Sequence, residues 1–264
     1  MKISIITVTY NSEKTLIETI DSIRKQQDED LEYIIVDGGS SDNTLRIIKQ
    51  NQDIITNWIS EPDKGISDAF NKGIRMTTGE IIGIINSDDK LNENALKIVR
   101  SAFDDKTDIL FGNCIYFGKG QRTYINKANP NVKELYNKMS IMHPATFIRK
   151  TAYQTYGMFN VDFKCAMDRE LLLRMLTKGA HFKYIDKELA WYRVGGSSRR
   201  NVFTKTFPED ERISIMYGKS KVKAKIYSIK KVINLLGSEW LSKHPGIEKD
   251  IRKLLKKEKA DYLE

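Results

Sequence analysis

The stretch that most constrains the fold is Ile81–Asp89, where four isoleucines within five residues lead directly to two adjacent carboxylates. An apolar run of this length, followed by turn-forming residues, predicts a strand that is buried on both faces of a mostly parallel sheet. Ligands of open α/β sheets bind outside the carboxyl ends of the strands. We therefore expect Asp88 and Asp89 to project into a ligand-binding crevice.

The residues alone leave two interpretations of this acidic pair open. Adjacent carboxylates repel each other unless a cation joins them, and oxygen ligands suit Mg²⁺ or Mn²⁺, usually together with a substrate phosphate. Alternatively, the pair forms a helix cap with Asn86 and Ser87, because these residue types favour helix N-termini and the pattern after Leu91 is helical.

Strand and helix patterns alternate before this stretch, as expected for βαβ units with parallel strands. The second half adds shorter strands and a helix whose first turn carries Asp168. The predicted strands cover residues 2–9, 31–36, 54–59, 81–86, 108–117, 122–125 and 145–148. The predicted helices cover residues 16–23, with Ser12 as N-cap, 45–48, 66–76 and 166–178.

The composition is that of a globular protein with one large or two small domains. Of its 264 residues, 40% are hydrophobic and 30% are charged. Cys114 and Cys165 fit neither a metal-ligand spacing nor a disulfide framework, which indicates a reducing cytoplasm. We expect no membrane-spanning segment, because the sequence has neither a long apolar run nor a signal-peptide pattern.

The net charge of +9 is concentrated near the C-terminus. Residues 219–264 contain 13 Lys and Arg against 6 Asp and Glu, whereas residues 1–218 contain 31 against 29. Apolar side chains recur at helical spacing among the lysines, at Val222, Ile226, Ile229, Ile233 and Leu236, and again after Pro245–Gly246. This pattern predicts basic amphipathic helices. They either lie on an anionic membrane surface or pack their apolar face on the rest of the protein.

Polar residues also gather where the other predicted strands end. Thr7, Thr9 and Tyr10 close the first strand, and Asp37 closes the second, just before Gly38–Gly39. Polar groups from remote segments at one edge of a parallel sheet make a nucleotide-sized site plausible, and glycines allow close backbone approach to a ligand. The sequence contains neither of the common glycine-rich phosphate-binding motifs, G-x-G-x-x-G and G-x-x-x-x-G-K-S/T. A metal would therefore have to hold a bound diphosphate.

Several motifs follow one another in a characteristic order: Thr7–Asn11, Asp37–Thr44, Ser60–Ile74, Asn86–Asp89, His143–Phe147, Asp168–Leu171 and Gly195–Ser198. Together they resemble the family 2 glycosyltransferases of the GT-A fold, and in particular the branch that assembles bacterial surface polysaccharides. The resemblance covers residues 1–200 approximately. It implies a Rossmann-like, mostly parallel central sheet flanked by helices. One departure is Asn86, where many relatives carry a further Asp.

The resemblance implies a nucleotide-sugar donor, with a UDP-sugar as the best candidate. Asp37 would hydrogen-bond the base, and Thr7 and Tyr10 would line the same pocket. Asp88 would reach the ribose or the donor sugar, and Asp89 would ligate Mg²⁺ or Mn²⁺. From the residues alone, turn formation explains Asp37 equally well.

Further residues are expected near the diphosphate and the acceptor. The resemblance implies that Lys64 and Asp68 flank the nucleotide and its diphosphate, although a solvated helix face is the alternative. His143 either touches the diphosphate or acceptor or is a hydrogen-bonded structural residue. The segment Trp191–Ser198 looks like a loop that closes over the donor, and Arg199–Arg200 beside it either neutralise phosphate charge or form an exposed basic loop.

The chemistry of glycosyl transfer gives Asp168 its expected role. Transfer from a nucleotide sugar resembles glycoside hydrolysis in its oxocarbenium-like transition state. A cation can stabilise the leaving diphosphate, so a single carboxylate base suffices and the anomeric configuration inverts. The resemblance implies Asp168 as this base, although Met167 stands where the family carries another acidic residue. The alternative is a charge that the helix dipole favours at a helix start.

We therefore predict an inverting, metal-dependent hexosyl- or N-acetylhexosaminyltransferase of surface polysaccharide biosynthesis, with a glycan or lipid-linked acceptor. Its GT-A catalytic domain would span residues 1–208, divided into a nucleotide-sugar half (1–112) and an acceptor half (113–208). A basic helical region, 209–264, would contact the inner face of the cell membrane. Two alternatives fit less well. A sugar nucleotidyltransferase should carry a glycine-rich phosphate loop, which this sequence lacks. A nucleic-acid-binding protein would explain the pI of 9.3, but residues 1–218 are nearly neutral.

Overall fold

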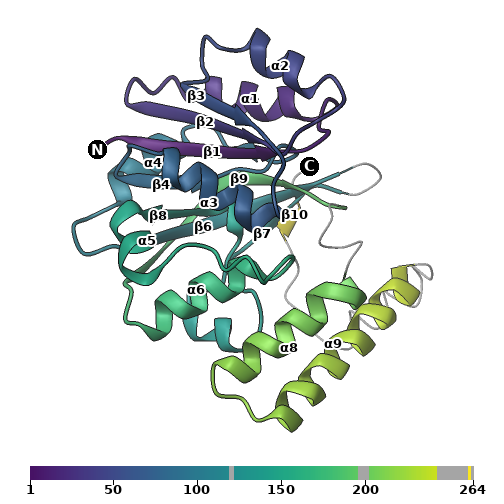
Figure 1. Ribbon diagram of the computed structural model, residues 1–264. Helices are drawn as coiled ribbons and strands as arrows, with labels where there is room; N and C mark the ends of the chain where they lie inside the picture. Colours follow the sequence, from purple (N-terminus) through teal and green to yellow (C-terminus); the bar gives the residue numbers. More distant parts are fainter. Residues whose placement is uncertain (119–121, 196–201, 243–260, 263–264) are drawn as a thin grey trace.

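The computed structural model of the protein describes residues 1–118, 122–195, 202–242 and 261–262 (Figure 1), with the backbone alone at 202–203, 231 and 234–242. A central β-sheet carries helices on both faces. In the described ranges its strand order is β10-β7-β6-β8-β4-β1-β2-β3, and β9 pairs with both β6 and β5. The α/β class that the sequence predicts is confirmed.

Four parallel strands form one half of the sheet, in the order β4-β1-β2-β3. Every residue of β1 is buried, because its isoleucines pack on both faces. Thr9 at the end of β1 lies opposite Asp37, and Ile6 lies opposite Ile84, so three strands end at one edge of the sheet. The bounds are β1 (Ile3–Thr9), β2 (Leu31–Asp37), β3 (Asn57–Ser60) and β4 (Ile81–Ile84).

The two faces of this half carry separate apolar cores, since successive strand residues point to opposite faces. Ile3 and Ile5 pack with α1 and α4, whereas Ile6 and Val8 pack with α3 and α6. The helices are α1 (Leu16–Arg24), α2 (Thr44–Gln50), α3 (Ile66–Met76), α4 (Ala95–Ala102), α5 (Lys150–Tyr156) and α6 (Met167–Thr177).

The second half of the sheet is mainly antiparallel. β8 runs antiparallel to both β4 and β6, and β9 lies parallel to β6 across an irregularity near Asn113. The strands are β5 (Lys90–Leu91), β6 (Ile109–Phe117), β7 (Tyr124–Asn126), β8 (Thr146–Arg149), β9 (Phe182–Arg193) and β10 (Asp261–Tyr262). Short helical turns are η1 (Val132–Tyr136), η2 (His143–Ala145) and η3 (Val202–Thr206).

Three local predictions were wrong. Trp191–Arg193 belong to β9 rather than to a closing loop, because they pair with β6. Ser12 is not the N-cap of α1: that position is Thr15, and the Ser12 hydroxyl lies 2.8 Å from the Ser87 hydroxyl. The third strand starts at Asn57, three residues later than predicted.

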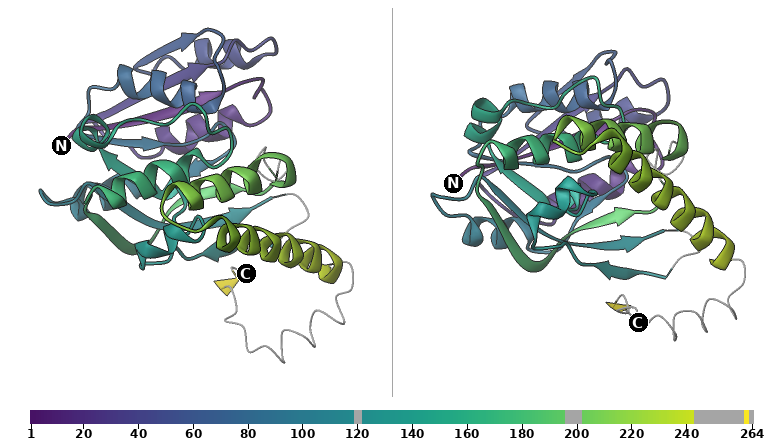
Figure 2. Two further views of the ribbon diagram at one scale, coloured as in Figure 1. Left: turned by 60° about the horizontal axis from the view of Figure 1, so that its bottom comes forward. Right: turned by 90° about the horizontal axis from the view of Figure 1, so that it is seen from below.

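Two helices beyond residue 206 lie side by side below α6 (Figures 1 and 2). α8 (Phe207–Met216) buries Ile213 in the core that α3 and α6 share. α9 (Lys221–Ser242) packs on α8 and contains the first run of predicted apolar positions, whereas the helix predicted after Pro245–Gly246 lies outside the described residues. None of the helices in the described ranges is long and apolar enough to cross a bilayer.

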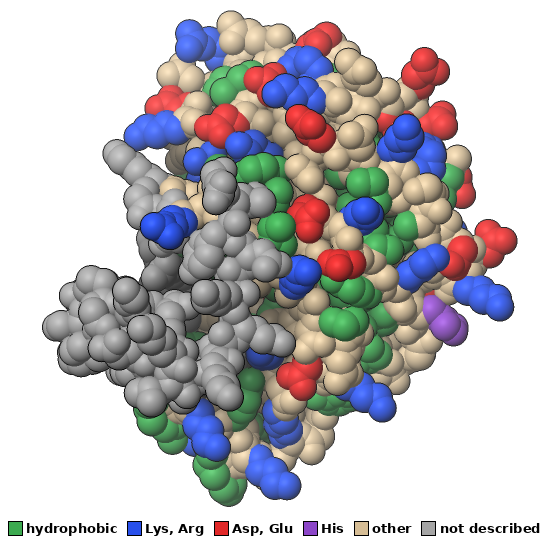
Figure 3. Space-filling model, turned by 180° about the vertical axis from the view of Figure 1, so that it is seen from behind, with side chains coloured by type: hydrophobic (Ala, Val, Ile, Leu, Met, Phe, Trp, Pro, Cys, Tyr) green, Lys and Arg blue, Asp and Glu red, His purple; other side chains and the backbone are tan. Residues whose placement is uncertain are grey.

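Charged side chains of both signs are mixed on the surface of the protein. On the face shown in Figure 3, the coloured surface carries basic and acidic side chains interspersed with apolar ones. This agrees with the near balance of 31 basic and 29 acidic residues in positions 1–218.

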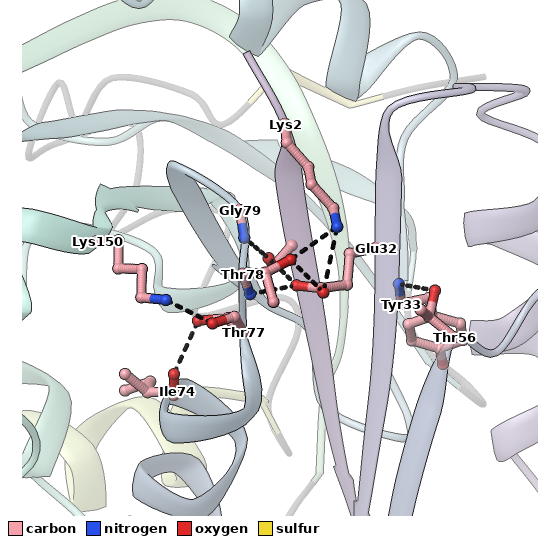
Figure 4. A network of polar contacts seen from close by, with 10 residues as sticks. Lys2, Glu32, Tyr33, Thr56, Ile74, Thr77, Thr78, Gly79 and Lys150 are labelled. Atoms are coloured by element: carbon pink, nitrogen blue, oxygen red, sulfur yellow. Dashed lines mark hydrogen bonds and ion pairs between the residues drawn. The ribbon is translucent and has the colours of Figure 1, made fainter.

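A polar network lies at the amino ends of β1 and β2, away from the predicted site (Figure 4). Glu32, only 5% exposed, accepts hydrogen bonds from Ser4 Oγ at 2.5 Å and from Thr78 N at 2.7 Å and Oγ1 at 2.6 Å. Lys2 Nζ lies 3.4 Å from its carboxylate. Burial alone would raise the pKa of Glu32, but these hydrogen bonds and the Lys2 charge outweigh it and lower the pKa to about 2.

Candidate active site at the carboxyl ends of the strands

The acidic pair sits in a turn directly after β4. Ile85 N donates to Ile6 O at 2.9 Å, which extends the strand by one residue, and Asp89 N donates to Asn86 O at 3.0 Å, which closes the turn. Asp89 is 1% exposed and Asp88 is half-buried. The capping interpretation is wrong, because α4 begins only at Ala95.

Arg193 of β9 fixes this turn from the neighbouring strand. Its backbone N–H donates to Asp89 Oδ1 at 2.8 Å, and its Nε donates to Asp88 O at 3.1 Å. Its Nη2 donates to Glu18 Oε2 at 2.8 Å, which ties α1 to the same place. Sequence reasoning assigned Arg193 to a loop and missed this role, because only the pairing of β9 with β5 and β6 reveals it.

The chemistry of the turn fits a divalent cation. Burial raises the pKa of Asp89 well above its usual range, and the adjacent Asp88 charge raises it further. Among the described residues, Thr9 Oγ1 and Asn86 Oδ1 are buried without a hydrogen-bond partner. No group of three His, Cys, Asp or Glu side chains in the described ranges could enclose a metal. Such a site resembles Mg²⁺ sites that one or two carboxylates and substrate phosphates complete.

The residues predicted to bind the nucleoside lie at the ends of β1 and β2. Asp37 is fully buried, and its Oδ2 accepts from Gly39 N at 3.1 Å, Ser40 N at 2.9 Å and Ser60 Oγ at 2.6 Å. Its carboxylate therefore organises the loop after β2, as a turn former does. Thr7 is also buried and accepts from Tyr33 Oη at 3.1 Å.

Tyr10 is 64% exposed and belongs to a close-packed group at this edge. A Cβ on Gly38 would lie 2.6 Å from Asp63 Oδ2 and 3.5 Å from the Tyr10 ring. A side chain at residue 38 would displace the Asp63 carboxylate from this position. Asp63 is thus a polar neighbour of the predicted nucleoside pocket that sequence reasoning did not single out, because the contact joins separate loops.

Lys64 and Asp68 lie together at the start of α3. Asp68 Oδ2 accepts from Lys64 N at 3.0 Å, and Lys72 Nζ lies 3.8 Å from the same oxygen. The Lys64 carbonyl accepts from Lys164 Nζ at 2.7 Å, which links this loop to the segment before α6. The Lys64 side chain is exposed, so it is free of the core.

His143 packs in an aromatic group beside α3. Its ring stacks on Phe70 with 5.2 Å between centroids and meets Phe159 edge-on at 6.1 Å. The residue retains some exposure, but protein atoms enclose the ring, and this burial lowers its pKa to about 4. The imidazole is therefore neutral at neutral pH, which favours the structural interpretation over pairing with a diphosphate.

Asp168 is the second residue of α6. Its Oδ1 accepts from Arg169 N at 2.7 Å, and burial raises its pKa to about 6, with the Asp210 charge adding to the effect. A carboxylate with a pKa near neutrality suits a general base. Both the catalytic and the helix-start interpretations agree with this geometry.

Two side chains fix the start of α6 from neighbouring elements. Arg169 is completely buried, and its five N–H groups donate to Leu135 O, Tyr136 O, Asp210 O, Asp210 Oδ1 and Ser214 Oγ. Glu209 of α8 accepts from the backbone N–H groups of Lys164, Cys165 and Ala166, each at 2.8 Å. α8 therefore packs against the helix that carries Asp168. The domain boundary predicted at residue 208 stays a prediction.

The pKa of Tyr192 responds to both acidic groups. Burial raises its pKa to about 12, and the charges of Asp89, Asp88 and Asp168 all contribute in the same direction. Tyr192 precedes Arg193 on β9, so it lies next to the residue that binds the acidic turn. Arg199, Arg200 and the Gly196–Ser198 segment lie outside the described residues.

The α/β sheet with carboxylates at the ends of its parallel strands has the architecture of the GT-A glycosyltransferase fold, which the solved structures described below share. The family model for glycosyl transferase family 2 matches residues 4–176. The chain therefore belongs to this family, and the protein is a glycosyltransferase.

Curated relatives agree with this assignment. A PGL/p-HBAD biosynthesis glycosyltransferase of Mycobacterium bovis is 29% identical over 225 residues, which are 80% of this chain and 86% of that protein. An uncharacterized glycosyltransferase of Mycobacterium tuberculosis is 28% identical over 181 residues, 65% of this chain and 68% of that one.

Solved structures share the fold. S. aureus TarS 1–349 in complex with UDP-GlcNAc has a TM-score of 0.67 and 21% identity, over 86% of this chain and 70% of that chain. Mannosyltransferase PcManGT from Pyrobaculum calidifontis, in complex with GDP-Man and Mn²⁺, has a TM-score of 0.62 and 18% identity, over 86% and 69% of the chains. The chain spans 42% of a longer TarS chain.

Proposed function

We propose that the protein is an inverting, cation-dependent glycosyltransferase that moves a sugar from a UDP-sugar to a hydroxyl group of a glycan or lipid-linked acceptor in polysaccharide biosynthesis. The observation that carries this proposal is the acidic turn directly after β4, at the edge where three parallel strands end, with Asp89 1% exposed and its Oδ1 bound by the Arg193 N–H. Asp168 at the start of α6 is a separate carboxylate, and the family match over residues 4–176 includes both places.

Asp89 is the residue that would hold Mg²⁺ or Mn²⁺, and Asp88 beside it would reach the ribose or the donor sugar. When bound, such a cation stabilises the negative charge of the departing diphosphate. The Arg193 N–H occupies Asp89 Oδ1, and Oδ2 has only a 3.5 Å contact with Asn86 Nδ2, so Oδ2 is the oxygen available for coordination. The solved PcManGT complex contains Mn²⁺, which supports a cation in this fold.

Asp168 is proposed to take the proton of the acceptor hydroxyl. The acceptor oxygen then forms a bond to the anomeric carbon, while the bond from that carbon to the diphosphate oxygen breaks. A single displacement of this kind inverts the anomeric configuration. With a pKa of about 6, the Asp168 carboxylate is mostly ionised at neutral pH and basic enough to accept a proton.

The loops after β1 and β2 are the proposed nucleoside pocket. Tyr10 offers an exposed ring for stacking, and Gly38 lies next to both this ring and Asp63. Thr7 and Asp37 support the pocket from within, since both are buried. Lys64 and Asp68 would flank the diphosphate from α3. The TarS complex with UDP-GlcNAc supports a uridine nucleotide as the donor.

Release of the nucleoside diphosphate tests this proposal. The full chain would be incubated with Mn²⁺ or Mg²⁺ and a panel of UDP-, GDP- and dTDP-sugars. We expect hydrolysis of a UDP-sugar that stops when EDTA is added. Asp88→Asn and Asp89→Asn should reduce it to background.

Asp105→Asn is the matched control. Asp104 and Asp105 are also adjacent aspartates, and Asp105, the second of them, is exposed. Hydrolysis that continues unchanged in EDTA would overturn the cation dependence. A panel in which only GDP- or dTDP-sugars react would overturn the uridine assignment.

A further inference from the structure

α9 exposes the apolar side of an amphipathic helix. Val222, Ile226, Ile229 and Ile233 follow at spacings of four, three and four residues, which places them on one stripe. Their exposed fractions are 69%, 49%, 49% and 62%. We call these four residues the α9 stripe. Leu236, which continues the pattern, lies among residues whose side chains are not described.

The opposite side of α9 is the one that faces the protein. Ala224 is 2% exposed, and Tyr227 lies against Lys219, whose Nζ is 4.6 Å from the ring centroid. The helix therefore packs with a small side chain and an aromatic ring, and leaves four β-branched side chains in solvent. Contiguous exposed apolar groups of this kind mark an interaction site.

Lysines line both edges of the α9 stripe. At 100° per residue, Lys221 and Lys225 fall on one edge, and Lys223 and Lys230 fall on the other. All four side chains are exposed, and only Lys225 has a described acidic partner, Glu211 at 3.7 Å. Lysines in this position keep their ammonium groups in water while their methylene stems follow an apolar group into an interface.

A groove of about 500 Å³ between α8 and α9 extends the apolar surface. Ile215, Met216 and Val232 line it together with Arg212, Lys225 and Glu211, and Glu211 is the acidic partner of Lys225. Met216 is itself 51% exposed. The groove therefore adds apolar surface, and its charged side chains are of both signs.

From this geometry we propose that the α9 stripe and its lysines dock the protein on an anionic lipid surface. A water-soluble protein partner would need its own apolar face and acidic rim, whereas anionic lipids provide both features at once. The stripe would enter the boundary between headgroups and acyl chains, and the lysines would contact lipid phosphates. This inference rests on the surface of α9 and of the neighbouring α8, and is independent of the proposed glycosyl transfer.

The docking would place the site next to the lipid surface. α9 packs on α8, and α8 binds the start of α6 through Glu209 and the Asp210–Arg169 pair. The proposed base, Asp168, follows directly on that start. A glycan carried on a lipid at the surface would thus meet the acceptor side of the protein.

Vesicle flotation of the full chain tests the proposal without any nucleotide sugar. We expect binding to vesicles of phosphatidylcholine mixed with phosphatidylglycerol, and weak binding to phosphatidylcholine alone. Each lysine near an anionic surface contributes about fivefold in affinity, so Lys223→Gln/Lys230→Gln should weaken binding roughly 25-fold. Ile226→Ser/Ile229→Ser should weaken it at least about tenfold. Both pairs are exposed, so the fold should persist.

Lys49→Gln/Lys97→Gln is the control, because it removes the same charge from exposed positions on α2 and α4. This control should bind within about twofold of the wild-type protein. Vesicle binding that is equal for wild type and both α9 double variants would overturn the proposal. So would a wild-type protein that ignores anionic vesicles but forms dimers that Ile226→Ser/Ile229→Ser dissociates, since the stripe would then bind a second copy. UDP release, measured separately, tests the enzymatic proposal.

Discussion

Replacing Asp168 by Asn separates a catalytic base from a helix-start charge. Asn retains the size of the side chain and an oxygen that can accept the 2.7 Å hydrogen bond from Arg169 N. It cannot accept the proton of an acceptor hydroxyl. Loss of a general base costs about 10² to 10⁴ in rate, or roughly 3 to 5 kcal/mol of barrier. Donor affinity should change little, because a base acts in the transition state.

The pH dependence follows from the raised pKa of Asp168. With a pKa of about 6, the carboxylate is the reactive, ionised form in about nine-tenths of molecules at pH 7 and about one-tenth at pH 5. Turnover at saturating cation and donor should therefore fall about tenfold between these pH values. The fall should be absent from the residual activity of Asp168→Asn.

Initial rates of sugar transfer, followed from pH 5 to 8 by nucleoside diphosphate release, provide the assay. Asp162→Asn is the control, because Asp162 is an exposed aspartate shortly before α6. If Asp168→Asn retains more than about a tenth of wild-type turnover, Asp168 is only a helix-start charge. If its rates keep the acidic limb near pH 6, another group is the base.

Three further substitutions test the supporting structure. Glu209→Ala leaves three backbone N–H groups at the start of α6 without their partner, and should lower the free energy of unfolding by about 1–2 kcal/mol in urea titrations. Glu211→Ala on the same helix loses one ion pair and should cost less than about 1 kcal/mol; equal costs would contradict the capping role. Arg193→Ala removes the side-chain hydrogen bonds to Asp88 O and Glu18 but keeps the backbone bond to Asp89, and should raise the cation concentration for half-maximal activity at least about 10-fold, whereas Arg46→Ala, at an exposed site, should not. Glu32→Gln should cost roughly 3 kcal/mol at pH 7, because the folded pKa of about 2 lies well below the ordinary 4.5. The stabilisation that comes from the lowered folded pKa is present above pH 4.5 and is lost as the pH falls toward 2. The free energies of unfolding of the wild-type and Glu32→Gln proteins should therefore converge in acid. A difference between them that does not change with pH would refute this assignment.

Local patterns in the sequence were sufficient for most of the parallel half. Helix α3 has the predicted bounds, Ile66–Met76, because its apolar side chains recur at helical spacing and Gly65 precedes it with a φ of 113°. The strand at Ile81–Ile84 was predicted because a short apolar run before turn residues admits few alternatives. Asp88 and Asp89 could be identified because they are adjacent in the chain.

The rest of the site depends on contacts between distant segments. Arg193 binds Asp88 and Asp89, which lie more than a hundred residues earlier in the chain. The pairing of β9 with β6 is what brings Arg193 and its neighbour Tyr192 to the site. The sequence around Arg169 gives no indication that all five N–H groups of its side chain have hydrogen-bond partners. Its burial depends on Asp210 and Ser214 of α8, about forty residues later. Charge counting placed those residues in a separate basic region.

Binding of the donor by three proteins tests the central claim, that Asp89 serves the cation and Asp168 serves the acceptor. Titration calorimetry would compare a UDP-sugar with wild type, Asp89→Asn and Asp168→Asn, each with Mn²⁺ and with EDTA. Asn at 89 can still accept the 2.8 Å hydrogen bond from Arg193 N, so the turn should persist. We predict cation-dependent binding by wild type and Asp168→Asn, and none by Asp89→Asn. Wild-type affinity in EDTA, or wild-type affinity in Asp89→Asn, would contradict the account.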